Sequence, residues 1–142
     1  MLEPLDSLLN IEKKLQKRLQ EISRKNNLTI SEWQLLKRIK KGEDTQSVLA
    51  INTSLDVSTL SRQLARLFSK GFLKKKKIAS INDHTRKTTQ YILNDAGQDA
   101  CDKMDSAYAK FEKKIFSPWT EEEYNLLKIL LNRLSTSLDR SI

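Results

Sequence analysis

Apolar residues recur every three or four positions along most of the chain, a spacing that predicts helices. The first helix is predicted over residues 3–26, where Pro4 suits the opening turn. Its apolar face consists of Leu5, Leu8, Leu15, Leu19 and Ile22. A second helix is predicted from a cap at Thr29 or Ser31 to a stop at Gly42. Its apolar positions are Trp33, Leu35, Leu36 and Ile39.

Two further helices are predicted, separated by a tight turn. The third begins at Asp44 or Thr45, and Asp56 caps the fourth, which ends at Gly71. Apolar residues of the third helix are Val48, Leu49 and Ile51. In the fourth helix apolar residues spaced by three, four and three are expected to form a buried stripe. They are Val57, Leu60, Leu64 and Leu67.

The pattern changes after Gly71. Phe72 to Ile81 and Thr88 to Leu93 predict two strands, with the polar segment between them as the tip of a hairpin. Helical spacing then returns in two seams of the kind found in coiled coils. The seams are Cys101, Met104, Tyr108, Phe111 and Ile115, followed by Leu127, Leu131, Leu134 and Leu138.

The order of these elements predicts a mainly α-helical chain with a small β-hairpin wing. We expect a winged helix-turn-helix domain over residues 31–94, flanked by N- and C-terminal dimerisation helices over residues 1–30 and 95–142. A homodimer is expected because neither terminal helix has enough neighbours within one chain to cover its apolar stripe.

Positive charge is concentrated in the middle of the chain. The formal net charge is +8, and residues 31–90 contain 13 basic and 5 acidic side chains. Residues 1–30 contain 6 and 4, and residues 91–142 contain 7 and 9. Such a distribution is typical of a module that contacts the phosphates of nucleic acid.

Opposite the leucine stripe, the fourth helix carries hydroxyl, amide and guanidinium groups and no acid. These side chains are Ser58, Thr59, Arg62, Gln63 and Arg66. They can hydrogen-bond base edges and phosphates, so this helix is predicted to bind double-stranded DNA together with Lys75, Arg86 and Lys87 of the wing. The alternatives are a solvated helix face and, for Lys74 to Lys77, lysines that protect an edge strand.

Other functional classes have little support in the sequence. The only histidine, His84, and the only cysteine, Cys101, fall on a hairpin tip and a helix seam, so no catalytic pair or metal site is expected. Cys101 is interpreted as a buried structural thiol rather than a redox sensor. Three glycines allow no phosphate-binding loop, and no cofactor is expected. Without a membrane-length apolar run or a secretory signal, we expect a cytoplasmic location.

Four segments together resemble the MarR family of bacterial transcriptional regulators. They are LTISEWQLL, TQSVLA, DVSTLSRQLARLFSKGFLKKKK and DHTRKTTQYILNDAGQDA, within residues 28–100. The resemblance implies a two-fold dimer with residues 56–70 in the major groove and the hairpin at residues 78–88 over the minor groove. It also implies a small effector, often phenolic or amphipathic, that releases DNA.

The wing departs from the family pattern. The family places Asp two residues before Arg, whereas Asp83 and Arg86 are three apart, and counting back from Leu93 puts Lys87 in the place of the arginine. Either Arg86 or Lys87 is therefore expected to enter the groove. The usual Leu-Thr is Leu93-Asn94 here, and Asn is an equally good helix cap.

The function expected from these features is a sequence-specific DNA-binding transcriptional regulator. The resemblance favours a ligand-responsive repressor that binds a pseudo-palindromic operator as a homodimer. The alternative is an architectural or protein-interaction winged-helix protein without operator selectivity.

Overall fold

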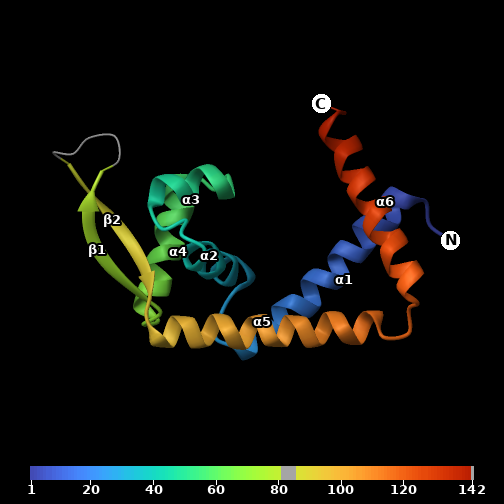
Figure 1. The fold of residues 1–142 in the computed structure, drawn as a ribbon, viewed down its shortest axis with the longest axis horizontal. Helices are drawn as coiled ribbons and strands as arrows, with labels where there is room; N and C mark the ends of the chain where they lie inside the picture. Colours follow the sequence, from blue (N-terminus) through green and yellow to red (C-terminus); the bar gives the residue numbers. More distant parts are fainter. Residues whose placement is uncertain (81–85, 142) are drawn as a thin grey trace. The chain divides into compact units, whose positions relative to one another are not determined.

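The structure is a computed structural model that describes residues 1–80 and 86–141, and it confirms the mainly helical winged helix-turn-helix fold (Figure 1). The elements in order are α1 (Pro4–Lys25), α2 (Ile30–Lys40), α3 (Gln46–Thr53), α4 (Val57–Ser69), β1 (Leu73–Ala79), β2 (Lys87–Leu93), α5 (Asp95–Phe116) and α6 (Glu121–Asp139). The chain forms two compact units, Met1–Tyr108 and Ala109–Ile142.

Side-chain caps begin α2, α3 and α4 where the sequence predicts. Thr29 forms a capping box with Glu32 at the start of α2, Thr45 caps α3 and Asp56 caps α4. Asn94 accepts a hydrogen bond from the Gly97 amide at 2.8 Å in the first turn of α5. These caps satisfy amide groups that have no partner inside a helix.

The core of the first unit is one cluster of apolar side chains from α2, α3, α4, the hairpin and the first half of α5. It includes Trp33, Leu35, Leu36, Ile39, Leu49, Leu60, Leu64, Leu67, Tyr91, Cys101 and Met104.

The prediction that Val57 belongs to the buried stripe of α4 was wrong, because its side chain is 65% exposed. It is the first residue of α4, so it lies at the very end of the helix.

The hairpin is a two-stranded antiparallel sheet in which Leu73 pairs with Leu93 and Ala79 with Lys87. The first strand is shorter than the predicted Phe72 to Ile81, and the second begins one residue before Thr88. Phe72 is buried ahead of β1, where its carbonyl oxygen accepts a hydrogen bond from the Asn94 amide at 3.2 Å. The predicted wing-tip residues Asp83 and His84 lie outside the described residues.

The first half of α5 packs inside the chain's own core, which corrects the prediction of a continuous dimer seam from Cys101 to Ile115. Cys101 and Met104 are fully buried in the first unit. The Trp33 indole donates to Asp105 Oδ1 at 2.8 Å, and the Trp33 and Tyr108 rings are 5.2 Å apart. These residues therefore have partners in the same chain.

In the second unit, aromatic rings surround the turn between α5 and α6. The Phe116 ring lies 5.0 Å from both Trp119 and Tyr124 in edge-to-face geometry. Thr120 and Glu123 form a capping box at the start of α6. No described residue of α6 is buried, and its exposed apolar side chains are Leu126, Ile129, Leu130, Leu131 and Leu138.

Gly97 permits a close approach between α5 and the chain just before β1. A Cβ at this position would overlap the carbonyl oxygen of Phe72 and lie 2.9 Å from its carbonyl carbon. Backbone atoms cannot rotate aside as a flexible side chain can. Only glycine fits here without a shift of α5 away from the start of the wing.

We expect Gly97→Ala to lower the free energy of unfolding by about 1–3 kcal/mol, because the added methyl group forces backbone movement in a packed region. Urea unfolding followed by circular dichroism measures this change. Ala96→Ser, at an exposed position in the same turn, is the control and should change stability by less than about 0.5 kcal/mol. Equal stability of Gly97→Ala and the unmodified chain would contradict the close approach.

Candidate nucleic-acid interface

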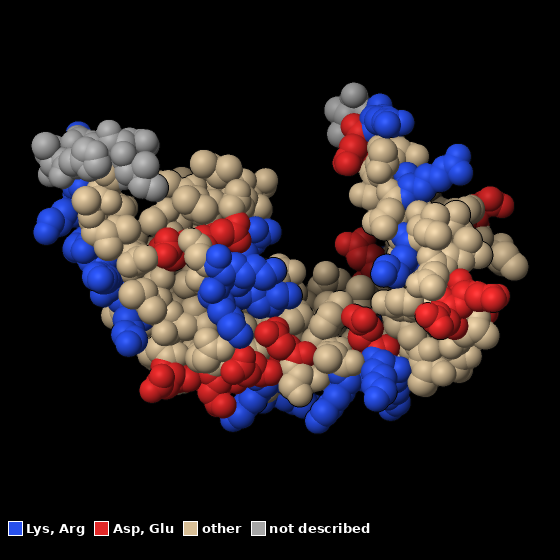
Figure 2. All heavy atoms as spheres, in the orientation of Figure 1, with Lys and Arg blue, Asp and Glu red and all other residues tan. Residues whose placement is uncertain are grey.

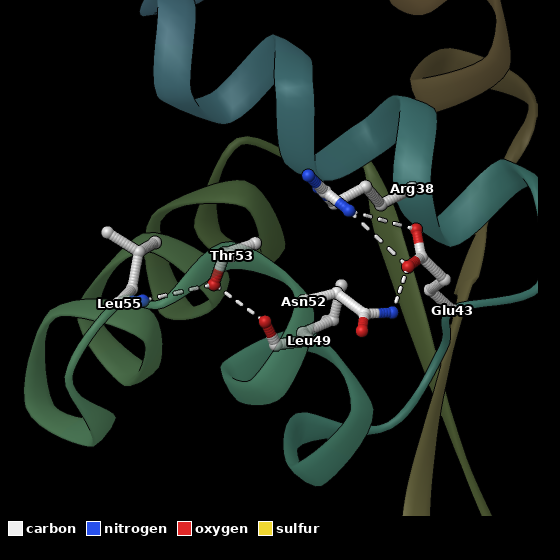
Figure 3. Close-up of polar contacts among 6 residues, drawn as sticks. All are labelled: Arg38, Glu43, Leu49, Asn52, Thr53 and Leu55. Carbon is white, nitrogen blue, oxygen red and sulfur yellow. Dashed lines mark hydrogen bonds and ion pairs between the residues drawn. The ribbon is translucent and has the colours of Figure 1, made fainter. Parts of the chain in front are cut away.

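α3 and α4 are joined by a turn that hydrogen bonds hold in place (Figure 3). The Thr53 hydroxyl donates to the Leu49 carbonyl at 2.6 Å and accepts from the Leu55 amide at 3.3 Å. Ser54 adopts a left-handed conformation with φ of 57°, which ends α3. Asn52 donates to Glu43, whose carboxylate also contacts Arg38 at 3.4 Å. Together these contacts connect α3 to α2.

The packing of α4 determines which of its side chains face outward. Leu60, Leu64 and Leu67 are at most 2% exposed, so the opposite side faces solvent. There Ser58, Arg62 and Arg66 are exposed, whereas Thr59 and Gln63 lie half-buried at one edge. The five predicted residues thus share one surface, with the two arginines one turn apart.

Hydrogen bonds order the first turn of this surface. Asp56 Oδ1 accepts from the Thr59 amide at 2.7 Å and from the Ser58 hydroxyl at 2.9 Å. These bonds, led by the Thr59 amide, lower the pKa of Asp56. Arg62 Nη2 lies 3.5 Å from Thr59 Oγ1. The lowered pKa keeps the Asp56 cap ionised at neutral pH.

Gln63 is less available than the sequence suggests. Its Oε1 atom is enclosed by protein and has no hydrogen-bond partner within the described part of the chain. A ligand that contacts Gln63 would therefore meet the side of its amide group or require a different side-chain conformation.

Lysines line β1 beside α4, and Figure 2 shows Lys and Arg side chains gathered along the hairpin. Lys74, Lys75, Lys76 and Lys77 are all exposed. Lys75 Nζ lies 4.5 Å from the Phe68 ring centre, a cation–π contact between β1 and α4. Because Lys75 pairs with the buried Tyr91, it projects from the face of the hairpin that packs on the domain. This lysine extends the positive surface of α4.

Near the tip, the described strand ends carry two of the predicted residues. Lys87 is exposed and pairs with Ala79, and exposed Arg86 accepts a backbone hydrogen bond from the Ser80 amide at 3.0 Å. The choice between Arg86 and Lys87 as the groove-contacting side chain stays open.

The wing is also fastened to the helix-turn-helix at a point that sequence reasoning missed. The Tyr91 amide donates to the Asp44 carbonyl at 2.8 Å, and Gln90 Nε2 donates to Asp44 Oδ2 at 2.7 Å. A single bridge also pairs Thr45 with Gln90. The segment before α3 therefore lies along β2 and positions the wing beside α4. Only the polar residues at 44 and 45 hinted at this contact.

The described residues contain no candidate metal site and no candidate membrane-spanning helix. Among residues 1–80 and 86–141, no group of three or more His, Cys, Asp or Glu side chains could hold a metal ion. No helix in that part of the chain is both long and apolar enough to cross a bilayer.

Comparison with known proteins identifies the fold. No protein-family model and no curated protein matches the sequence. Solved structures do match, among them apo MarR from E. coli, at 22% identity and a TM-score of 0.70 over 94% of this chain and 98% of that one. A MarR mutant from E. coli complexed with operator DNA matches at 23% identity and a TM-score of 0.71, over 92% of this chain and 93% of that one. The S. aureus MepR–DNA complex matches at 17% identity and a TM-score of 0.75, over 96% of each chain. The chain therefore has the winged helix-turn-helix fold of the MarR and MepR structures.

Cys101 is expected to be unreactive in the folded protein. Burial, and secondarily the Asp105 carboxylate, raises the pKa of its thiol to about 11 from 9.0. A rise of about two units lowers the thiolate fraction at pH 8 about a hundredfold, and only the thiolate reacts. Ellman's reagent at pH 8 should modify the native chain at least about a hundredfold more slowly than the chain unfolded in guanidinium. Comparable rates would show that the thiol is accessible.

Proposed function

We propose that this protein is a DNA-binding transcriptional regulator that recognises a specific operator. The observation that carries the proposal is the outward face of α4, where exposed Ser58, Arg62 and Arg66 lie opposite a fully buried leucine stripe. Arginine can donate two hydrogen bonds to one guanine edge, and hydroxyl groups can bind bases or phosphates. The lysines of β1 lie beside this face, where the backbone of the same duplex would run.

We further propose that the regulator acts as a homodimer on a pseudo-palindromic site. Exposed leucine and isoleucine side chains on α1 and α6 support this, since an unpaired chain would leave both faces in water. A two-fold dimer places one α4 helix in each of two major-groove segments about one helical turn apart. As a protein that acts on chromosomal DNA, it would be cytoplasmic.

Repression released by a small effector is the finer part of the proposal. An open cavity of about 440 Å³ between α1 and α2, within the size range of ligand sites, supports it. Its wall includes Arg24, Leu28 and Thr29, next to Asn27, whose carbonyl accepts a 2.9 Å hydrogen bond from Lys70. Lys70 is the C-cap of α4, so a ligand in the cavity would lie against the residue next to one that contacts the end of this helix.

An architectural role without operator selectivity is the competing function, favoured by the exposed lysines of β1. Such a protein would bind any duplex through phosphates. The two functions differ in the ratio of specific to non-specific affinity, which is about a thousandfold or more for a regulator.

We expect the double variant Arg62→Ala, Arg66→Ala to lose operator affinity. Each arginine that contacts a base should contribute about 1–3 kcal/mol, and for each such arginine the base preference should weaken at one position per half-site. Fluorescence anisotropy with operators selected from a random duplex pool measures both effects. The matched control, Arg18→Ala with Arg133→Ala, removes two exposed arginines elsewhere and should alter binding only weakly. If both double variants bind alike, the arginines of α4 have no special role.

We expect Leu131→Asp to dissociate the dimer. Leu131 is 45% exposed on α6, so an aspartate at this position would be hydrated in a single chain. A dimer interface that covers this position would bury the charge, and that burial costs free energy. Light scattering at micromolar concentration measures the mass, and operator affinity should fall with the dimer. Asn132→Asp adds the same charge at a polar position of α6 and should remain dimeric. A monomeric mass for the unmodified chain would overturn the proposal.

A further inference from the structure

Val57 is an apolar side chain exposed at the leading end of the proposed DNA-binding helix. It is the first residue of α4 and 65% exposed, although Leu60, three residues later, is fully buried. The exposure requires either solvent or a ligand beside these methyl groups.

The polar groups around Val57 already have partners within the protein. Asp56 accepts hydrogen bonds from the Ser58 hydroxyl and the Thr59 amide, and Thr59 Oγ1 lies within 3.5 Å of Arg62. The first turn of α4 therefore presents a branched apolar group next to a cap whose carboxylate already accepts two hydrogen bonds. A methyl group is the complement of such a surface, since it needs no hydrogen bond.

A side-chain hydrogen bond joins α3 to α4 one turn after Val57. Gln46, the first residue of α3, donates from Nε2 to Ser61 Oγ at 2.6 Å. Ser61 and Val57 are four residues apart and lie on the same side of α4. Val57 is thus one turn ahead of the residue of α4 that contacts α3.

From this arrangement we infer that Val57 contacts the C5-methyl group of a thymine in each half-site and so determines specificity at that base pair. The inference rests on the proposed function and deepens it. Thymine presents the only methyl group among the four bases in the major groove, and small apolar side chains are its usual partners. Arg62 and Ser58, on the adjacent side of the helix, would contact neighbouring bases or phosphates.

The test removes the methyl group from the DNA and the valine from the protein. An operator is selected from a random duplex pool with the full chain, and each thymine is then replaced by uracil, which pairs identically but lacks the methyl. We expect one thymine per half-site at which uracil weakens binding about fourfold, the equivalent of about 0.8 kcal/mol for one buried methyl group. Val57→Ala should weaken binding to the thymine operator similarly and should no longer distinguish thymine from uracil.

A second exposed apolar residue provides the matched control. Ile51 of α3 is 78% exposed, and Ile51→Ala should retain the full sensitivity to uracil. Thermal unfolding should be unchanged in Val57→Ala, because an exposed side chain contributes little to packing. A selected operator at which uracil never matters, or a uracil effect that persists in Val57→Ala, overturns the inference and leaves the proposed function intact. A pool with no enriched sequence overturns both.

Discussion

The burial of one face of α4 is the constraint on which the rest of the structure depends. Leu60, Leu64 and Leu67 are enclosed by α2, α3 and the hairpin, and truncating a buried leucine costs about 2–5 kcal/mol. Rotation of α4 about its axis would expose these side chains and bury guanidinium groups without partners. The same packing that stabilises the domain therefore keeps Arg62 and Arg66 at the surface, and stability and the proposed DNA contact depend on one helix orientation.

A buried ion pair adds a second constraint at the opposite end of α4. Lys70 Nζ lies 2.8 Å from Glu32 Oε1, and the Glu32 side chain is only 1% exposed. Glu32 also closes the capping box of α2 by accepting from the Thr29 amide at 2.8 Å. The Lys70 side chain is 27% exposed, so water screens the pair in part, but removal of the lysine would leave the Glu32 carboxylate buried without its cation. One carboxylate thus joins the start of α2, the end of α4 and, through Lys70, the turn after α1. Thr29, which donates to Glu32, also lines the α1–α2 cavity, so this network and the cavity wall share a residue.

The wing is held from two directions. Lys75 lies over the ring of Phe68 of α4. Asp44 accepts hydrogen bonds from the backbone amide of Tyr91 and the side chain of Gln90, both in β2. Gly97 lets α5 approach the backbone of Phe72 just before β1 begins. The base of the hairpin is therefore fixed relative to α4, as required if both elements are to meet one duplex. The raised pKa of Cys101 follows from the same close packing, because the first half of α5 is part of the core.

The sequence by itself determined the features that depend on neighbours a few residues apart. Helix starts at Thr29, Thr45 and Asp56 follow from side chains that cap amides three residues later, and the polar face of α4 follows from helical periodicity. Only the tertiary structure decided what depends on distant segments. Periodicity assigns Val57 and Leu60 to the same stripe, yet one is exposed and the other buried, because burial depends on which elements reach the end of the helix. A seam of apolar residues likewise does not reveal whether its cover comes from the same chain, as for Cys101 and Met104, or from a partner. The contacts of Glu32 with Lys70 and of Gly97 with Phe72 join residues 38 and 25 positions apart, distances over which no local pattern carries information.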